Sequence, residues 1–153
     1  MKKTILYLLL AVALLGTTTA SARKVKVPKM YMFGFAAAFT DTIVHFTPVQ
    51  ELDSVWIESK NNFLQKREAY SYQLRSYLSE NEQMPQRTCV VVYAQDRKKL
   101  EKKYQKMKKL YTTSKDGLAH YDVRYIEGNK FHFQYVDAGD VVETVEEAEE
   151  GKE

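Results

Sequence analysis

The chain has 153 residues, of which 44% are hydrophobic and 28% charged, and its formal net charge is +3. This composition is typical of one ordinary domain with a buried core. Cys89 is the only cysteine, which excludes an internal disulfide and, because it lies far from the N-terminus, a lipid anchor there. The charge is uneven: residues 140–153 hold seven acids against one lysine, a net of −6, and residues 23–139 are near +7.

Residues 1–22 have the three parts of a secretory signal peptide. Two lysines are followed by an apolar run over residues 5–15 and by Ala20-Ser21-Ala22, a small-x-small cleavage pattern. The run is shorter than the ~20 residues that span a bilayer. We therefore expect cleavage near Ala22 and a soluble mature protein of about 131 residues (153 minus 22), periplasmic or secreted, with no transmembrane segment.

Two strands are expected next. Residues 23–29 form a basic, Pro-containing leading segment, and Met30–Phe39 then alternates aromatic side chains with small ones such as Gly34. Both faces are apolar, which predicts an interior strand, and the small-residue face allows another element to approach closely. A turn joins this strand to Ile43–Thr47, so the two form a hairpin.

The middle of the chain predicts a helix and a buried strand. Val49–Ile57 is ambiguous: it either opens the helix or forms a short turn of its own. Ser59–Glu80 has apolar residues three or four apart and is predicted to be helical. After a break, Thr88–Ala94 is a continuous apolar run typical of a strand covered on both sides. Cys89 in this run is expected to be buried and unreactive, not a nucleophile.

A second helix and a hairpin are predicted to complete the domain. Asp96 suits the N-cap of a helix over Arg97–Tyr111. Two alternating segments follow, Tyr121–Tyr125 and Phe131–Tyr135. A three-residue loop between them keeps the aromatic side chains on one face, whereas a two-residue loop mixes the faces, so we prefer the three-residue loop.

The expected element order is therefore β-β-α-β-α-β-β. This order predicts an α+β fold, a two-layer sandwich with a mixed, mainly antiparallel sheet and two helices. Residues 23–139 form this single domain, and residues 140–153 form an acidic tail whose composition predicts disorder. The strand order does not follow from the sequence.

Three histidines, His45, His120 and His132, lie on three predicted strands. If the strand of His45 neighbours the last hairpin, the three side chains converge, and three imidazoles with an acid suit zinc or copper. No local HxH or HxxxH spacing supports this, and histidines are common on the open face of a sheet. A metal site therefore remains a minor hypothesis, and the sequence indicates no cofactor.

Signatures of catalysis are missing from the sequence. It contains no Gly-x-Ser-x-Gly elbow, no Gly-rich phosphate loop and no HExxH motif. The acids of residues 23–139 have the spacing of solvated helix and loop residues, not of a carboxylate pair across a cleft. We therefore expect a protein that is not an enzyme.

The predicted helix over Arg97–Tyr111 carries eight positive charges against Glu101 alone, and it is amphipathic. It would suit an anionic partner: lipid headgroups, an acidic envelope polymer or the chain's own tail. Nucleic acid fits the charge but not the export signal, and lysine without interleaved aromatics reads bases poorly. A solvated helix face is the alternative. The candidate anion-binding residues are Arg97, Lys98, Lys99, Lys102, Lys103, Lys106 and Lys109.

Three segments carry a resemblance to other proteins. Tyr31–Phe39, Arg87–Val91 and the lysine-rich Arg97–Tyr104 together resemble small exported hypothetical proteins of Bacteroidales bacteria. The resemblance covers about residues 28–137 and implies a Gram-negative periplasm. It carries over no function and no site residues.

These observations lead to three hypotheses on function. The first is an exported, soluble, non-enzymatic domain that binds an unidentified partner protein or ligand in the periplasm. The second is an envelope-surface protein that associates with anionic lipid or polymer through the lysine-rich helix. The third is a small metal-binding protein or hydrolase. The sequence leaves the oligomeric state open.

Overall fold

The computed structural model describes residues 23–114, 117–118 and 120–139; the predicted signal peptide and acidic tail lie outside these residues. In this part of the chain a six-stranded sheet has the order β4-β3-β1-β2-β6, with β5 on the other edge of β1. The elements are β1 (Lys24–Ala37), β2 (Ile43–Phe46), β3 (Gln50–Glu58), β4 (Phe63–Leu64), α2 (Arg67–Asn81), β5 (Thr88–Ala94), α3 (Arg97–Thr112) and β6 (Asp122–Tyr125).

The long strand β1 is the centre of the sheet. Along one edge it pairs antiparallel with β3 and then with β2, where Phe35 lies opposite Phe46. Along the other edge it pairs antiparallel with β5, where Gly34 lies opposite Val91. Only the pairing of β2 with β6 is parallel among the described strands. The α+β class, the mixed, mainly antiparallel sheet and the first hairpin are therefore confirmed.

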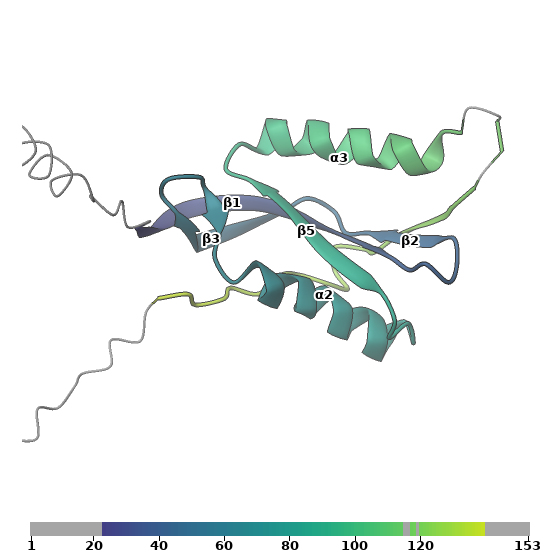
Figure 1. The fold of residues 1–153 in the computed structure, drawn as a ribbon, viewed down its shortest axis with the longest axis horizontal. Helices are drawn as coiled ribbons and strands as arrows, with labels where there is room; N and C mark the ends of the chain where they lie inside the picture. Colours follow the sequence, from purple (N-terminus) through teal and green to yellow (C-terminus); the bar gives the residue numbers. More distant parts are fainter. Residues whose placement is uncertain (1–22, 115–116, 119, 140–153) are drawn as a thin grey trace, which may run out of the picture.

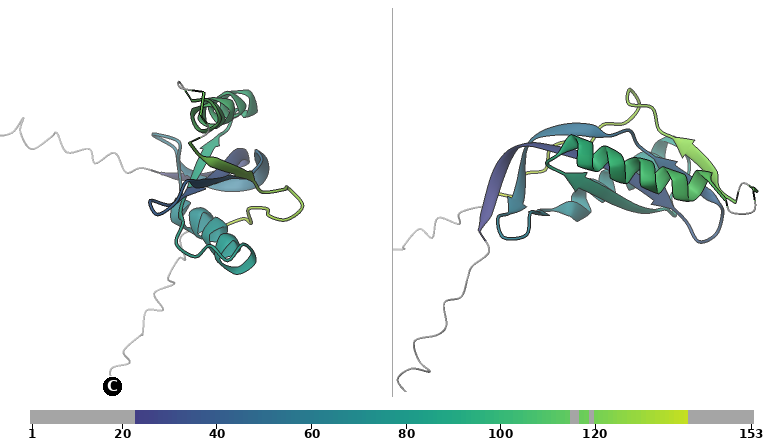
Figure 2. Two further views of the ribbon diagram at one scale, coloured as in Figure 1. Left: turned by 90° about the vertical axis from the view of Figure 1, so that its right-hand side faces the viewer. Right: turned by 90° about the horizontal axis from the view of Figure 1, so that it is seen from above.

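The two helices cover opposite faces of the sheet (Figures 1 and 2). Met30, Met32 and Ala36 belong to the core on the α2 side, whereas Phe33 and Phe35 belong to the core on the α3 side. Because β1 alternates two apolar faces, each face needs a cover, and each takes one helix. The layers are therefore helix, sheet and helix, one more than the two-layer arrangement expected from the sequence.

In the core on the α2 side, the side chains of Leu74 and Phe133 approach Gly34 closely. A Cβ atom at this position would lie 2.6 Å from Leu74 Cδ2 and 3.1 Å from Phe133 Cζ. Leu74 and Tyr70 are completely buried there. The expectation that the small-residue face of this strand admits another element is confirmed, and the elements are α2 and the segment around Phe133.

The core on the α3 side is aromatic. The ring of Phe33 meets that of Tyr104 edge to face at a centroid distance of 4.9 Å, and Phe35 meets Phe46 at 5.0 Å. Leu100 is the fully buried residue of α3. The helix begins as predicted, because the Asp96 side chain accepts a hydrogen bond from the Lys99 N–H at 3.0 Å.

Three expectations for the N-terminal half were wrong. The leading segment 23–29 is largely part of β1, and Val49–Ile57 forms most of β3. Residues 59–66 do not open the helix either: β4 pairs back onto β3, and α2 begins only after Lys66, which has a positive φ of 53°. The backbone therefore reverses direction where the apolar spacing predicted a continuous helix.

The expected hairpin at the end of the domain was also wrong. Residues 122–125 form β6 and pair with β2, but residues 131–139 are not a strand. Instead the chain turns at Glu127, whose carbonyl accepts a hydrogen bond from Lys130, and passes to the α2 side. Phe131 and Phe133 are buried there. Burying these two rings against α2 replaces the strand pairing that alternation predicted.

The backbone of this C-terminal segment is hydrogen-bonded to side chains and not to a neighbouring strand. Gln50 Nε2 donates a hydrogen bond to the Phe131 carbonyl at 3.0 Å, and its Oε1 accepts one from the Phe133 N–H at 2.9 Å. Gln73 on α2 makes the same pair of bonds to both backbone groups of Gln134. The segment is thereby fixed along one flank of α2.

Candidate functional site

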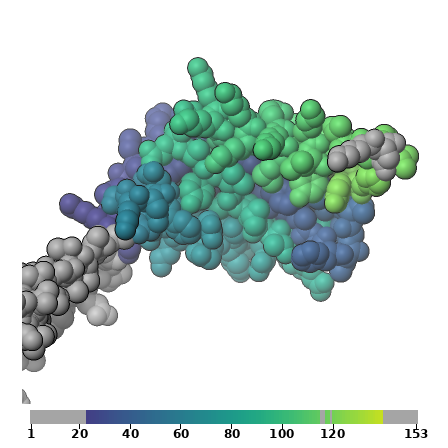
Figure 3. All heavy atoms as spheres, turned by 45° about the horizontal axis from the view of Figure 1, so that its top comes forward, coloured from purple at the N-terminus to yellow at the C-terminus, as the bar shows by residue number. Residues whose placement is uncertain are grey.

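All seven candidate anion-binding residues of α3 are exposed. Arg97 donates a hydrogen bond to Glu101 at 2.8 Å, and its guanidinium lies over the Tyr31 ring at 6.0 Å. Within residues 23–114, 117–118 and 120–139, no ion pair involves the six lysines among these candidates. Figure 3 shows α3 (green) along the upper part of the visible face, with side chains projecting from it. The structure thus presents a cationic surface at the predicted residues, and anion binding there stays a prediction.

The three histidines occupy different environments. His45 is 2% exposed, lies opposite Ala36 on the α2 side of the sheet, and neither ring nitrogen has a hydrogen-bond partner. His120 and His132 are exposed. No group of three His, Cys, Asp or Glu residues in the described part of the chain is arranged to hold a metal ion. The structure therefore does not bring the three histidines together.

The surroundings of His45 favour the neutral form of its ring. Burial is the main cause that lowers its pKa below the ordinary value, and the positive charges of Arg87 and Arg124 act in the same direction. Arg87 is itself buried, and its guanidinium donates hydrogen bonds to both carboxylate oxygens of Asp41, at 2.7 and 2.6 Å. The environment of His45 therefore disfavours the charged form of its ring.

Cys89 is buried, as the sequence predicted. Burial raises the pKa of its thiol to about 11, although the positive charge of Arg75 partly opposes this shift. A thiol that stays protonated at neutral pH is a poor nucleophile. The position of Cys89 nevertheless matters, because it lies on the wall of a groove that the sequence did not reveal.

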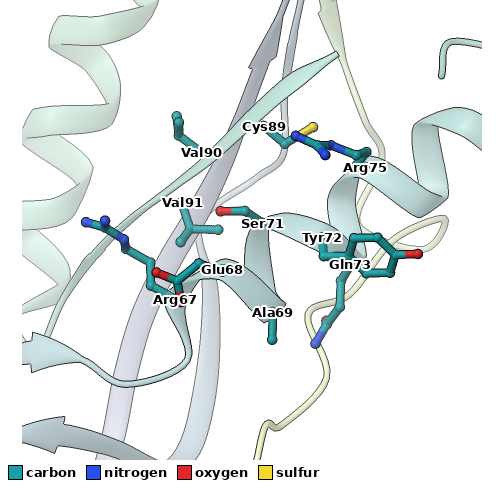
Figure 4. A pocket seen from close by; sticks show the side chains of 10 residues that line it. All are labelled: Arg67, Glu68, Ala69, Ser71, Tyr72, Gln73, Arg75, Cys89, Val90 and Val91. Atoms are coloured by element: carbon teal, nitrogen blue, oxygen red, sulfur yellow. The ribbon is translucent and has the colours of Figure 1, made fainter. Parts of the chain in front are cut away.

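This groove runs between α2 and β5 and has a volume of about 920 Å³. Figure 4 shows Ser71 and Arg75 on α2 pointing toward β5, with Arg75 beside Cys89, whereas Ala69 and Gln73 point away. Arg67 and Glu68 lie at the beginning of the helix, and the opposite wall consists of Cys89, Val90 and Val91. We call this feature the α2–β5 groove.

The outer edge of β5 beside the groove is unpaired. Its inner edge pairs with β1, and no strand of the described residues pairs with its outer edge. Sheet edges usually carry a charge, a proline or a bulge that prevents pairing with another chain. Thr88–Ala94 has no charged residue and no proline, and Val90 is 43% exposed. This edge is therefore open to an added strand.

The α2–β5 groove has a positive rim. Arg67, Ser71 and Arg75 are four residues apart and form one stripe of α2, on the flank that faces β5. Glu68 is the single acid of the lining. The Arg67 guanidinium lies over the Phe63 ring at 4.8 Å, a cation–π contact that orients it. The groove thus combines apolar walls, unpaired backbone groups and two cations.

Sequence reasoning missed this groove for a definable reason. It treated Ser59–Glu80 as one continuous helix and Thr88–Ala94 as a strand covered on both sides. The two faces of β5 are indeed partly covered, but coverage of the faces says nothing about the edge, which depends on strand order. The signal that was available is the absence of charge and proline in Thr88–Ala94 together with the arginine spacing on the preceding helix.

Comparison with known proteins adds no assignment. The chain matches no protein-family model, no curated protein sequence and no solved structure. Neither helix in the described residues has the length and apolar character needed to cross a membrane.

Proposed function

We propose that this protein is an exported, non-enzymatic binding domain of the periplasm, and that the α2–β5 groove binds an extended segment of a partner polypeptide. Export rests on the signal-peptide pattern of residues 1–22 and on the resemblance to exported Bacteroidales proteins. The observation that carries the binding role is the unpaired, uncharged edge of β5 beside an open groove.

An extended polypeptide fits this site better than a small molecule. The backbone N–H and C=O groups of a free edge alternate along the strand, and another strand satisfies them in register. The groove is open along β5 instead of enclosed, and alternate side chains of an added strand would point toward the α2–β5 groove. Main-chain hydrogen bonds then supply affinity, and the groove supplies specificity.

The structure offers a precedent within the chain. On the other flank of α2, residues 131–136 form no regular secondary structure, and Gln50, Gln73 and Tyr70 hold their backbone by hydrogen bonds. That flank is filled, and the flank beside β5 is open. A polypeptide segment in the α2–β5 groove would cover α2 on its second side in the same way.

The test uses three fluorescein-labelled peptides of about ten residues, in which valine alternates with glutamate, glutamine or lysine, a length that matches β5 and its surroundings. We expect at least one peptide to bind the exported protein and to slow amide hydrogen exchange in residues 88–94. Ser71→Trp, which fills the groove, should weaken that binding about tenfold or more. Ser76→Trp is the matched control, because Ser76 is on the same helix and does not line the groove.

Alternate N-methylation of the best-binding peptide distinguishes strand addition from simple adhesion. Because successive N–H groups of a strand point to opposite edges, methylation of one alternate set should abolish binding and methylation of the other should not. The proposed function is contradicted if methylation of either set weakens binding equally. It is also contradicted if no peptide binds and residues 88–94 gain no protection from exchange.

A second candidate function rests on α3, whose seven candidate residues are all exposed. In this proposal the protein associates with anionic lipid or polymer through that helix. Deletion of residues 140–153, which carry a net charge of −6, should then increase retention on heparin or on vesicles containing phosphatidylglycerol at low salt. Equal retention of both forms at low salt would make α3 an ordinary solvated helix.

A further inference from the structure

We infer that the segment bound at the β5 edge is acidic, with its row of carboxylate side chains toward α2. This inference rests on the proposed function, since it specifies the chemistry of the polypeptide that the α2–β5 groove takes. The occupant to which we assign the site is an extended segment of another protein. The structure places positive charges on the two sides of this strand edge.

The geometry of strand addition defines two rows of contacts. Side chains of an added strand alternate between the two faces of the sheet, so one row faces α2 and the other faces α3. On β5 itself, Cys89, Val91 and Tyr93 belong to the α2 side, whereas Val92 and Ala94 belong to the α3 side. Each row of the ligand therefore meets one helix flank.

On the α2 side the ligand row meets Arg67 and Arg75. These two arginines are the first and the last residue of α2 that line the groove, with Ser71 between them. Glu68 is the one negative charge in this lining, so the net charge of this wall is positive. Arginine presents several donors in a planar fork that matches a carboxylate, so this wall favours acidic side chains.

On the α3 side the ligand row meets a lysine flank. Lys99 lines a smaller hollow of about 330 Å³ with Tyr93 and Ala94, the last two residues of β5, which places the beginning of this flank of α3 beside that end of the strand. Asp96 also lines that hollow, but its carboxylate already accepts the Lys99 N–H. Lys103 and Lys106 follow Lys99 at helical spacing, so the flank is positive over two turns.

Exposed apolar side chains on the α3 side suit the aliphatic residues of such a ligand. Val90 is 43% exposed on the α3 side of β5, and Leu110, which continues the stripe of Lys99, Lys103 and Lys106, is 67% exposed. The opposite flank of α3 differs, since Lys98 and Lys102 lie around Val49 and Pro48, away from β5. A ligand that alternates or mixes aliphatic residues with acids fits the β5 side, and a basic ligand meets cations on both sides.

The test compares the three valine-alternating peptides by fluorescence anisotropy. We expect the glutamate peptide to bind about tenfold or more tightly than the glutamine peptide, with the lysine peptide weakest, and ~0.5 M NaCl to reduce this difference. In the double variant Arg67→Glu, Arg75→Glu the preference should fall or reverse. The control variant Lys98→Glu, Lys102→Glu makes the same change in net charge on the flank away from β5 and should keep the preference.

The outcomes separate this inference from the proposed function. Equal binding of the glutamate and glutamine peptides, or equal effects of the two double variants, overturns the charge inference and leaves strand addition standing. No binding of any peptide overturns both. The chain's own acidic residues 140–153 are the other possible occupant: if their deletion raises affinity for the glutamate peptide about tenfold or more, the assignment to a separate polypeptide is overturned.

Discussion

The buried side chain of Gln50 offers a quantitative test of how the C-terminal segment is held. We propose the substitution Gln50→Leu, which keeps the approximate size of the side chain and removes its amide. In the native protein this amide satisfies the Phe131 carbonyl and the Phe133 N–H, and Phe131 and Phe133 are 7% and 6% exposed. After substitution these two backbone groups have no partner and little access to water.

The expected cost follows from the desolvation of these two groups. Leaving one buried donor or acceptor unsatisfied costs about 1–3 kcal/mol, so the loss of both partners in Gln50→Leu should lower the free energy of unfolding by about 2–6 kcal/mol. Gln73→Leu is the matched control, because Gln73 makes the same two bonds to Gln134 at an exposed position. Water replaces the lost partner there, so we expect a cost of about 1 kcal/mol or less.

Urea denaturation gives the two free energies, and amide exchange of residues 131–139 shows whether the loss is local. We expect faster exchange in this segment for Gln50→Leu, even where the rest of the domain stays protected. Equal destabilisation by the two glutamine variants would refute the reasoning. So would a change of less than about 0.5 kcal/mol for Gln50→Leu, which lies within the range of ordinary surface substitutions.

Three further predictions follow from the packing. Gly34→Ala should lower the free energy of unfolding by about 1–3 kcal/mol in urea titrations, because the added Cβ lies 2.6 Å from the buried Leu74 Cδ2; an unchanged midpoint would mean that this contact relaxes freely. His45 has a lowered pKa in the folded state, so the unfolded chain binds more protons, and stability should fall as pH drops from about 6.5 toward that lower pKa. His45→Met should remove this part of the pH dependence, and an identical pH profile in both proteins would contradict it. Cys89, with its pKa raised to about 11, should react with a thiol reagent at neutral pH much more slowly in the native protein than in urea, and equal rates would show an open thiol.

The elements that were predicted correctly carry strong local signals. The N-cap Asp96 and the apolar stripe of the following helix fix α3, and the uninterrupted Thr88–Ala94 run fixes β5. These signals depend on neighbours within a few residues. The tertiary structure agrees with these local signals because the buried stripe of α3 and the side chains of β5 pack against the two apolar faces of β1.

The strand β3 was missed because its alternation is interrupted. Gln50 and Leu52 face the core, and after Ser54, which has a φ of 60°, Val55 and Ile57 face it. The spacing of three between Leu52 and Val55 is typical of a helix, so the pattern favoured no single structure. A change of face within a strand depends on the paired chain, and it is not visible in one segment of sequence.

The candidate sites also include one that could be predicted from local sequence and one that could not. The exposed cations of α3 could be predicted, because charge and helical spacing are local. The α2–β5 groove could not, since it depends on which strand edge is left unpaired and on which flank of α2 the segment 131–136 occupies. Both are decided by contacts between residues far apart in the chain.

The central place of β1 has a consequence for the order in which the molecule assembles. This strand is the first element of the domain, yet its last partner is β5, and the pairing of Tyr31 with Ala94 closes a loop of 63 residues (94 minus 31). Closing loops of this length costs chain entropy before the contacts repay it, and topologies rich in such contacts fold slowly. Until Ala94 is available, β1 exposes its most apolar residues without their cover. A chain of this topology stays unfolded for longer than one built from neighbouring segments. Under the export that we propose, this delay would leave time for passage through a translocation pore.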